Sequence, residues 1–283
     1  MSRSILLLGG PDSGKTNYVG RVWPALDAGG GCLHAAVQPE DIRFVLDVAD
    51  HLYSGNFAPR SEHADERRDF EVVVAAEKGG EQTTIVIPDI SGELWLNAAV
   101  YGEVPTTLME EMRSANGALL FVRVNSEADV RPLDWVTSKK LLAKLGNVDD
   151  KGLPTQVMLC ELLRFLETSL SERPDGQPPR VSIVVSAWDI VDQKKFAMGP
   201  KAWLEREYPL VAGRLDDSEA IDLRVFGLSV VGGDLKADET CRNDVQENGL
   251  DGRGWVAIQD DEGVWQRDPD LTLPIAWAAG SSS

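Results

Sequence analysis

The sequence is poor in basic residues and has no long hydrophobic run, and each shortage argues against a class of function. Its 283 residues include 28 lysines and arginines against 46 aspartates and glutamates, so the formal net charge is −18. A surface with this balance repels nucleic acid and anionic membranes, and we expect neither as a partner. The apolar run after Met1 is too short for a signal peptide, and no run reaches membrane-spanning length.

Cysteine is scarce as well. The three cysteines, Cys32, Cys160 and Cys241, are odd in number and lack the spacing of a metal site. This pattern favours a reducing compartment, so we expect the protein in the cytoplasm. The apolar content of 43% is ordinary for a chain with a hydrophobic core, and the sequence contains no internal repeat.

The most informative stretch lies at the start of the chain. An apolar run ends in a glycine-rich turn, then a lysine and a threonine, and matches the pattern G-x-x-x-x-G-K-[ST]. Backbone N–H groups and a helix N-terminus surround phosphate oxygens in this motif, the lysine reaches the β- and γ-phosphates, and the hydroxyl ligates Mg²⁺. The alternative is a strand–turn–helix that matches by chance. The predicted phosphate site comprises Gly9, Gly10, Pro11, Asp12, Ser13, Gly14, Lys15 and Thr16, with Thr16 as the metal ligand.

Strands that alternate with helical patterns predict a three-layer α/β domain built on a mostly parallel sheet. Only about four residues join the strand at 69–76 to the strand at 83–89, too few for a parallel crossover. We therefore expect this pair to be an antiparallel hairpin, which makes one strand of the sheet antiparallel. Further strands are expected near residues 4–8, 32–37, 117–124, 181–185 and 223–228.

Two intervals, at about 127–180 and 234–266, are longer than a nucleotide-binding core requires. We interpret them as inserted helical and small hairpin segments within one domain that spans residues 1–283. Residues 234–251 are polar and are expected to be poorly ordered. Helices are expected at 17–26, 135–145, 156–171 and 200–215, a small hairpin at 255–265, and a closing helix at 271–279 that is capped by Asp270.

A second motif ends the strand at 83–89. Asp89 at the strand end can hold the shell of a metal ion through water, and the backbone N–H of Gly92 can contact a γ-phosphate only when one is present. This segment is therefore a candidate switch, and a plain turn is the alternative.

Two further strand ends predict a base site. Asp189 follows a buried strand in the run Ser186-Ala187-Trp188-Asp189, and its carboxylate can accept hydrogen bonds from N1–H and the N2 amine of guanine. Adenine has no such donor pair, so the residue predicts guanine, although a helix-capping aspartate is the alternative. Backbone N–H groups near Ser229 and Val230, after the last parallel strand, are expected at the guanine O6.

The order of these motifs over roughly residues 4–232 resembles the clade of P-loop GTPases related to Ras and the translation factors (TRAFAC). It looks most like a bacterial subgroup, the small double-GTPases of conflict or phage-defence systems. The resemblance implies a P-loop NTPase fold and a molecular switch that binds GTP or GDP with Mg²⁺ and hydrolyses GTP. It also implies a protein effector or activating partner, such as a second GTPase-like protein.

Several positions depart from the family's pattern. The lysine that packs over the base is Ala187 here, and Trp188 is either a partial substitute or a core residue. The catalytic glutamine is Glu93, which can accept a hydrogen bond from water but cannot donate one to the γ-phosphate. We therefore expect slow hydrolysis without a partner.

The first switch loop, at residues 55–68, lacks the threonine that the family uses for Mg²⁺. Ser61 is the expected substitute, and Arg60 is either an arginine finger or a solvated loop residue. Catalytic roles thus fall to Glu93, Arg60 and Lys15. Two alternatives stay open: a nucleotide-binding scaffold that hydrolyses poorly, and an ATPase or small-molecule kinase.

Overall fold

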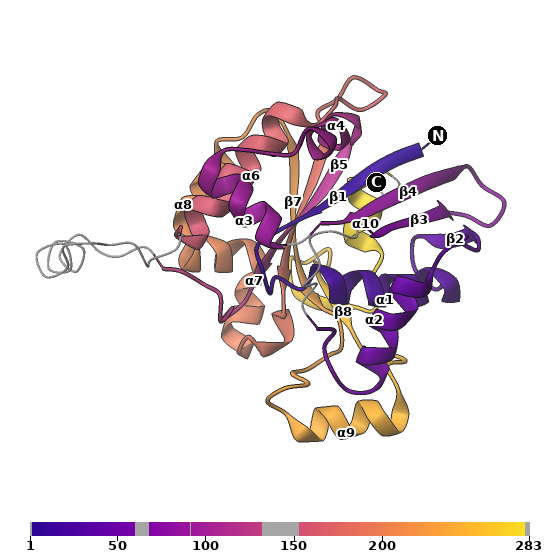
Figure 1. Cartoon of the computed structure of the whole chain (residues 1–283). Coiled ribbons are helices and arrows are strands. Elements are labelled where there is room, and N and C mark those ends of the chain that lie inside the picture. The colour runs from indigo at the N-terminus through magenta and orange to yellow at the C-terminus, as the bar shows by residue number, and fades with distance from the viewer. Residues whose placement is uncertain (1, 60–67, 91, 132–152, 281–283) are drawn as a thin grey trace, which may run out of the picture.

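A central sheet with helices on both faces organises the molecule (Figure 1). The computed structural model describes residues 2–59, 68–90, 92–131 and 153–280. Within these ranges the sheet has nine strands in the order β2-β3-β4-β1-β5-β6-β7-β8-β9. The architecture confirms the expected three-layer α/β fold of a P-loop NTPase.

The strands and helices have the following bounds. The strands are β1 (Ser2–Leu8), β2 (His34–Val37), β3 (Arg68–Ala75), β4 (Gln82–Asp89), β5 (Gly117–Arg123), β6 (Arg180–Ser186), β7 (Asp222–Ser229), β8 (Trp255–Gln259) and β9 (Trp265–Asp268). Among the described residues, the helices are α1 (Lys15–Ala28), α2 (Arg43–Tyr53), α3 (Gly92–Tyr101), α4 (Thr106–Ser114), α6 (Thr155–Ser169), α7 (Gln193–Glu207), α8 (Pro209–Asp216), α9 (Glu239–Asn248) and α10 (Leu273–Ala278), and η1 (Trp188–Ile190) is a 3₁₀ turn.

The central strands β4, β1, β5, β6 and β7 run parallel, so their carboxyl ends meet at one edge of the sheet. β3 pairs antiparallel with β4 from Arg68↔Asp89 to Ala75↔Gln82, which confirms the expected hairpin. The structure adds a second antiparallel strand, because β8 pairs with β7 through Gly227–Ser229. The small hairpin of β8 and β9 therefore extends the main sheet.

Alternating side chains of β1 reach the two halves of the core. Leu6 and Leu8 pack with residues of α3, α4 and α6 on one face, while Ile5 and Leu7 pack with residues of α1 and α10 on the other. A strand covered on both faces has to be apolar at every position, which explains the unbroken run before the phosphate loop. None of the helices in the described ranges combines the length and apolar composition needed to cross a bilayer.

The expectation that residues 234–251 are poorly ordered is wrong. Residues of this segment form α9, whose N-terminus is capped by Asp238: the carboxylate accepts from the N–H groups of Thr240 and Cys241 at 2.9 and 3.1 Å. Val245 is buried in a small cluster with Leu52 of α2. Only a few apolar residues form this cluster, so the segment as a whole is polar. Composition alone therefore does not reveal the helix.

Other boundaries differ from expectation at proline and glycine. The helix expected at 200–215 is two helices, because Tyr208 leaves helical geometry with a φ of −130° and a ψ of 58° and Pro209 then opens α8. α10 begins at Leu273 with Thr272 as its N-cap, and Asp270 instead accepts hydrogen bonds from the Thr272 N–H and hydroxyl. α6 lies in the interval 127–180 and makes the crossover between β5 and β6, while the helix expected at 135–145 lies outside the described residues.

Two helical glycines give a matched test of the packing between α1 and α2. A Cβ on Gly20 would lie 2.3 Å from Val48 Cγ1, whereas a Cβ on Gly213 of α8 would meet nothing within 4 Å. We expect Gly20→Ala to lower the free energy of unfolding by roughly 1–3 kcal/mol through overpacking. Gly213→Ala should raise it by up to about 1 kcal/mol, because alanine favours helix. Urea denaturation of both variants measures the difference, and equal effects would contradict the packing of α1 on α2.

Candidate nucleotide-binding site

The loop between β1 and α1 lies at the carboxyl edge of the parallel strands. Gly9 has a φ of 144°, and a Cβ at this position would lie 2.8 Å from the carbonyl oxygen of Phe121 in β5. Only glycine allows β5 to approach the loop this closely. Gly14 is the N-cap of α1 with a φ of 92°, so the helix begins at Lys15 as the motif requires.

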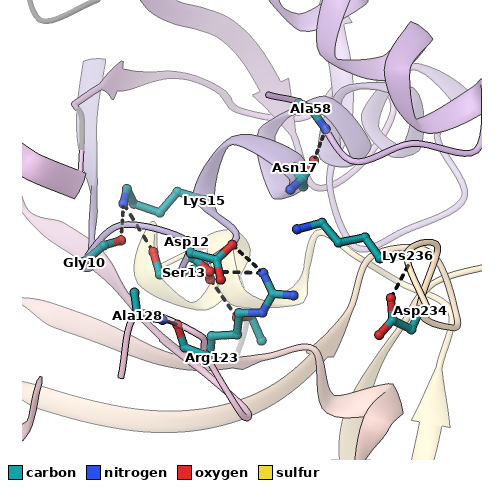
Figure 2. Close-up of polar contacts among 12 residues, drawn as sticks. Gly10, Asp12, Ser13, Lys15, Asn17, Ala58, Arg123, Ala128, Asp234 and Lys236 are labelled. Atoms are coloured by element: carbon teal, nitrogen blue, oxygen red, sulfur yellow. Dashed lines mark hydrogen bonds and ion pairs between the residues drawn. The ribbon is translucent and has the colours of Figure 1, made fainter. Parts of the chain in front are cut away.

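The Lys15 side chain folds back into the loop (Figure 2). Its Nζ donates to the carbonyl oxygens of Gly9 and Gly10 at 2.8 and 3.1 Å and to Ser13 Oγ at 3.2 Å. The residue is only 9% exposed, so these oxygens take the place of water around its charge. The ammonium group therefore lies within the ring of backbone groups that the motif predicts.

A turn after β6 connects the predicted base motif to the loop. Ser186 Oγ donates to the carbonyl oxygen of Ser13 at 2.7 Å. Ala187 then adopts a left-handed conformation with a φ of 54°. Trp188 is fully buried and packs edge to face against Trp203, with the ring centroids 6.0 Å apart, so it is a core residue.

Asp189 and the loop after β7 line one pocket beside the phosphate loop. The pocket is also lined by Gly14 and Ser186. Residues from three of the predicted motifs thus meet at one place. The pocket's remaining walls include Asn17, Phe57, Arg123, Val230 and Asp234.

The environment of Asp189 is unfavourable for a free carboxylate. Burial is the main cause that raises the pKa of Asp189, and the charge of Asp234 raises it further. A hydrogen bond with Ser229 lowers this pKa but does not reverse the shift. Ser229 itself is fully buried, and its Oγ accepts from the Gly232 N–H at 2.9 Å. A ligand that donates hydrogen bonds to Asp189 would stabilise the charged carboxylate that burial disfavours.

Arg21 of α1 holds the loop after β7 in place. Its Nε donates to the Val230 carbonyl oxygen at 3.1 Å, and its Nη2 donates to those of Leu250 and Arg253 at 3.1 and 2.8 Å. Burial lowers the pKa of Arg21, and the residue is 7% exposed. Sequence reasoning missed this residue, because its acceptors are backbone groups far along the chain.

The predicted switch segment touches the phosphate loop. A Cβ on Gly92 would lie 2.4 Å from the Pro11 nitrogen, so α3 begins in contact with the loop backbone. Trp95 is fully buried and donates from Nε1 to the Leu7 carbonyl oxygen at 3.2 Å, which ties α3 to β1. Glu93 is exposed in the first turn of α3.

Three predicted residues cannot be placed in full. Arg60 and Ser61 lie outside the described residues. Asp89 is the last residue of β4, next to β1 in the sheet, and its side chain lies outside the described part. Thr16 is partly exposed in the first turn of α1.

Phe57, Asn17 and Arg123 are site residues that sequence reasoning missed. The Asn17 side-chain oxygen accepts from the Ala58 N–H at 3.0 Å, which joins α1 to the segment that carries Phe57 (Figure 2). Arg123 donates to Asp12 from the end of β5. None of the three belongs to a motif by itself. The place of β5 beside β1 in the sheet brings Arg123 to the pocket, whereas Asn17 directly follows Thr16 in α1 and Phe57 lies in the segment after α2.

Comparison with known proteins gives one family. A family model described as Double-GTPase 1 matches residues 6–278, which is nearly the whole chain. No curated protein matches the chain significantly.

The raised pKa of Asp189 predicts how stability depends on pH. The folded state favours the protonated carboxyl, so the stability this group contributes is present at low pH and is lost as pH rises through its folded-state pKa. We therefore expect ligand-free Asp189→Asn to melt at a higher temperature than the wild type at pH 7. The gap should close as pH falls toward the ordinary aspartate value of 3.8.

The matched control for this prediction is Asp192→Asn. The Lys195 N–H lowers the pKa of Asp192, which is the opposite direction, so its variant should show no gain at pH 7. Thermal melts at a series of pH values measure both, and a lower melting temperature of Asp189→Asn at pH 7 would contradict the prediction.

Proposed function

The chain belongs to the Double-GTPase 1 family, and from this premise we propose that it binds and hydrolyses GTP as a cytoplasmic molecular switch. One observation carries the proposal: Gly14 of the phosphate loop, Ser186, Asp189 and Val230 line a single pocket. A nucleotide with its phosphates at Lys15 would have its base beside Asp189.

The phosphate loop is suited to hold the triphosphate. Its backbone amides and the N-terminus of α1 attract phosphate oxygens. The Lys15 ammonium lies at the same loop, where it donates to the Gly9 carbonyl oxygen. Thr16 lies just after the loop that follows β1, and Asp89 is the last residue of β4, the parallel neighbour of β1. Both residues carry oxygen donors, which Mg²⁺ prefers as ligands. Mg²⁺ would neutralise charge on the β- and γ-phosphates, and Thr16, Asp89 and Ser61 are the residues proposed to hold it.

The proposed base reading rests on the chemistry of Asp189. Asp189 is a partly buried carboxylate whose pKa is raised by burial, and it would be stabilised by a ligand that supplies two hydrogen-bond donors, as guanine does. Backbone N–H groups of Ser229 and Val230 are proposed at the guanine O6, and Arg21 steadies the Val230 carbonyl. Ala187 leaves the lysine of the related GTPases without a counterpart on this turn.

The start of α3 is the proposed γ-phosphate sensor. Gly92 packs on Pro11 of the phosphate loop, so a γ-phosphate bound at this loop would lie next to the start of α3. The far end of α3 exposes Val100 at 44% and Tyr101 at 72%, which supports a protein partner that responds to α3. We propose an effector or activator, or a second GTPase-like protein, in a bacterial conflict or phage-defence system.

A second candidate function is a nucleotide-binding scaffold with little turnover. Glu93, in the place of the usual glutamine, favours it, because its charge opposes the γ-phosphate and it cannot donate a hydrogen bond. In both functions the nucleotide governs a protein partner, and the rate of hydrolysis separates them. Arg60 is a proposed cis finger for the first function only.

Nucleotide affinity tests the proposed function. Titration of the wild type should show tighter binding of GTP and GDP than of ATP, and Lys15→Ala should weaken GTP binding by about 100-fold or more through loss of a charge-assisted contact. Lys201→Ala is the control, since Lys201 is exposed and pairs with Asp216 far from the loop.

Asp189→Asn sharpens the test of base recognition. Asparagine offers one acceptor and one donor, so it should weaken GTP binding and favour xanthosine triphosphate, whose C2 carbonyl accepts. Preference of the wild type for ATP, or unchanged base preference in Asp189→Asn, would overturn the proposed base reading.

Hydrolysis tests the role of Glu93. We expect Glu93→Gln to raise the rate of phosphate release by about tenfold or more, because glutamine can orient water and donate to the γ-phosphate. GTP affinity should change little. Glu103→Gln, an exposed glutamate beyond α3, is the control. A rate that does not rise would favour the scaffold function.

A further inference from the structure

The phosphate loop of this chain carries an acidic side chain of its own. Asp12 lies in the middle of the loop with a φ of 61°, a left-handed conformation that aspartate adopts more readily than most residues. Its side chain is only 14% exposed. An unpaired carboxylate there would repel the phosphates that the proposed function brings to the neighbouring amides.

Arg123 neutralises this carboxylate. Arg123 is the last residue of β5, and its Nη1 lies 2.8 Å from Asp12 Oδ1 and 3.2 Å from the Asp12 carbonyl oxygen (Figure 2). Its side chain is 22% exposed, so solvent and salt screen the pair less than they screen a surface pair. The same group therefore cancels the charge of Asp12 and holds the loop backbone.

Arg123 also faces the base side of the site. It lines the pocket that contains Asp189 and Val230, and its Nε is buried without a hydrogen-bond partner among the described residues. A cation at this junction matters in a chain with a net charge of −18, because a polyanion needs a local positive site.

We propose that Arg123 is a positioning residue for the nucleotide phosphates: it acts through Asp12, by neutralising a carboxylate that would otherwise repel them. The inference rests on the proposed function, because it concerns how that loop accepts phosphates. A purely structural brace is the competing explanation, and the two differ in what happens when Asp12 is neutralised independently.

Nucleotide titration of Arg123→Gln, Asp12→Asn and the double variant tests the proposal. Arg123→Gln should weaken GTP binding by about tenfold or more, since it leaves a bare carboxylate beside the phosphates. The loss should be larger for GTP than for GDP and for GDP than for GMP, and it should shrink at high salt. The double variant should bind GTP within about threefold of the wild type, because the two changes are coupled.

Two further variants keep the test decisive. Arg123→Lys retains the charge, so it should keep most of the affinity even if Arg123→Gln folds poorly, and thermal melts report folding of every variant. Arg43→Gln with Asp41→Asn is the matched control, since this exposed pair has a similar 2.7 Å contact and lies outside the site. It should leave nucleotide affinity unchanged.

Three outcomes are distinguishable. Unchanged GTP affinity in Arg123→Gln would overturn the inference, and so would a double variant that binds as weakly as Arg123→Gln, since that result marks a structural brace. A wild type that binds no guanine nucleotide would overturn the proposed function itself, and this shows in the wild-type titration before any variant is compared.

Discussion

A buried ammonium group shapes the loop on which the site depends. Lys15 is 9% exposed, and a charge with so little water is stable only where oxygens surround it. The carbonyl oxygens of Gly9 and Gly10 and the hydroxyl of Ser13 meet that requirement. The loop's own oxygens thus surround the ammonium, and a bound phosphate would replace some of them.

The neighbouring strands hold this loop through contacts that leave little room for change. β5 approaches Gly9 so closely that no side chain fits, β6 reaches Ser13 through Ser186, and α3 packs Gly92 on the loop. Around them the chain is strongly acidic, yet Lys15, Arg21 and Arg123 gather beside the pocket. Local cations within an acidic surface are what binding of a nucleotide polyanion requires.

Much of the fold was predictable, and the failures have physical causes. The hairpin of β3 and β4 followed from the length of its connection, since a short link forbids a parallel pair. β8 joins β7 through only three residues, and α9 is stabilised by a few apolar side chains and the Asp238 cap. Both depend on a few contacts with partners that are distant in sequence, and a local pattern carries too little of that information.

The sequence by itself determined the glycine-rich loop that opens α1, because adjacent residues encode it and their own chemistry sets its backbone geometry; the guanine-reading role of Asp189 stays a prediction of the sequence. Only the tertiary structure decided that Ser186 binds Ser13, that Arg21 supports Val230 and that Arg123 pairs with Asp12. Those contacts join residues more than a hundred positions apart. They exist because the order of strands in the sheet, which no local pattern specifies, places the carboxyl ends of β1, β5, β6 and β7 at one edge.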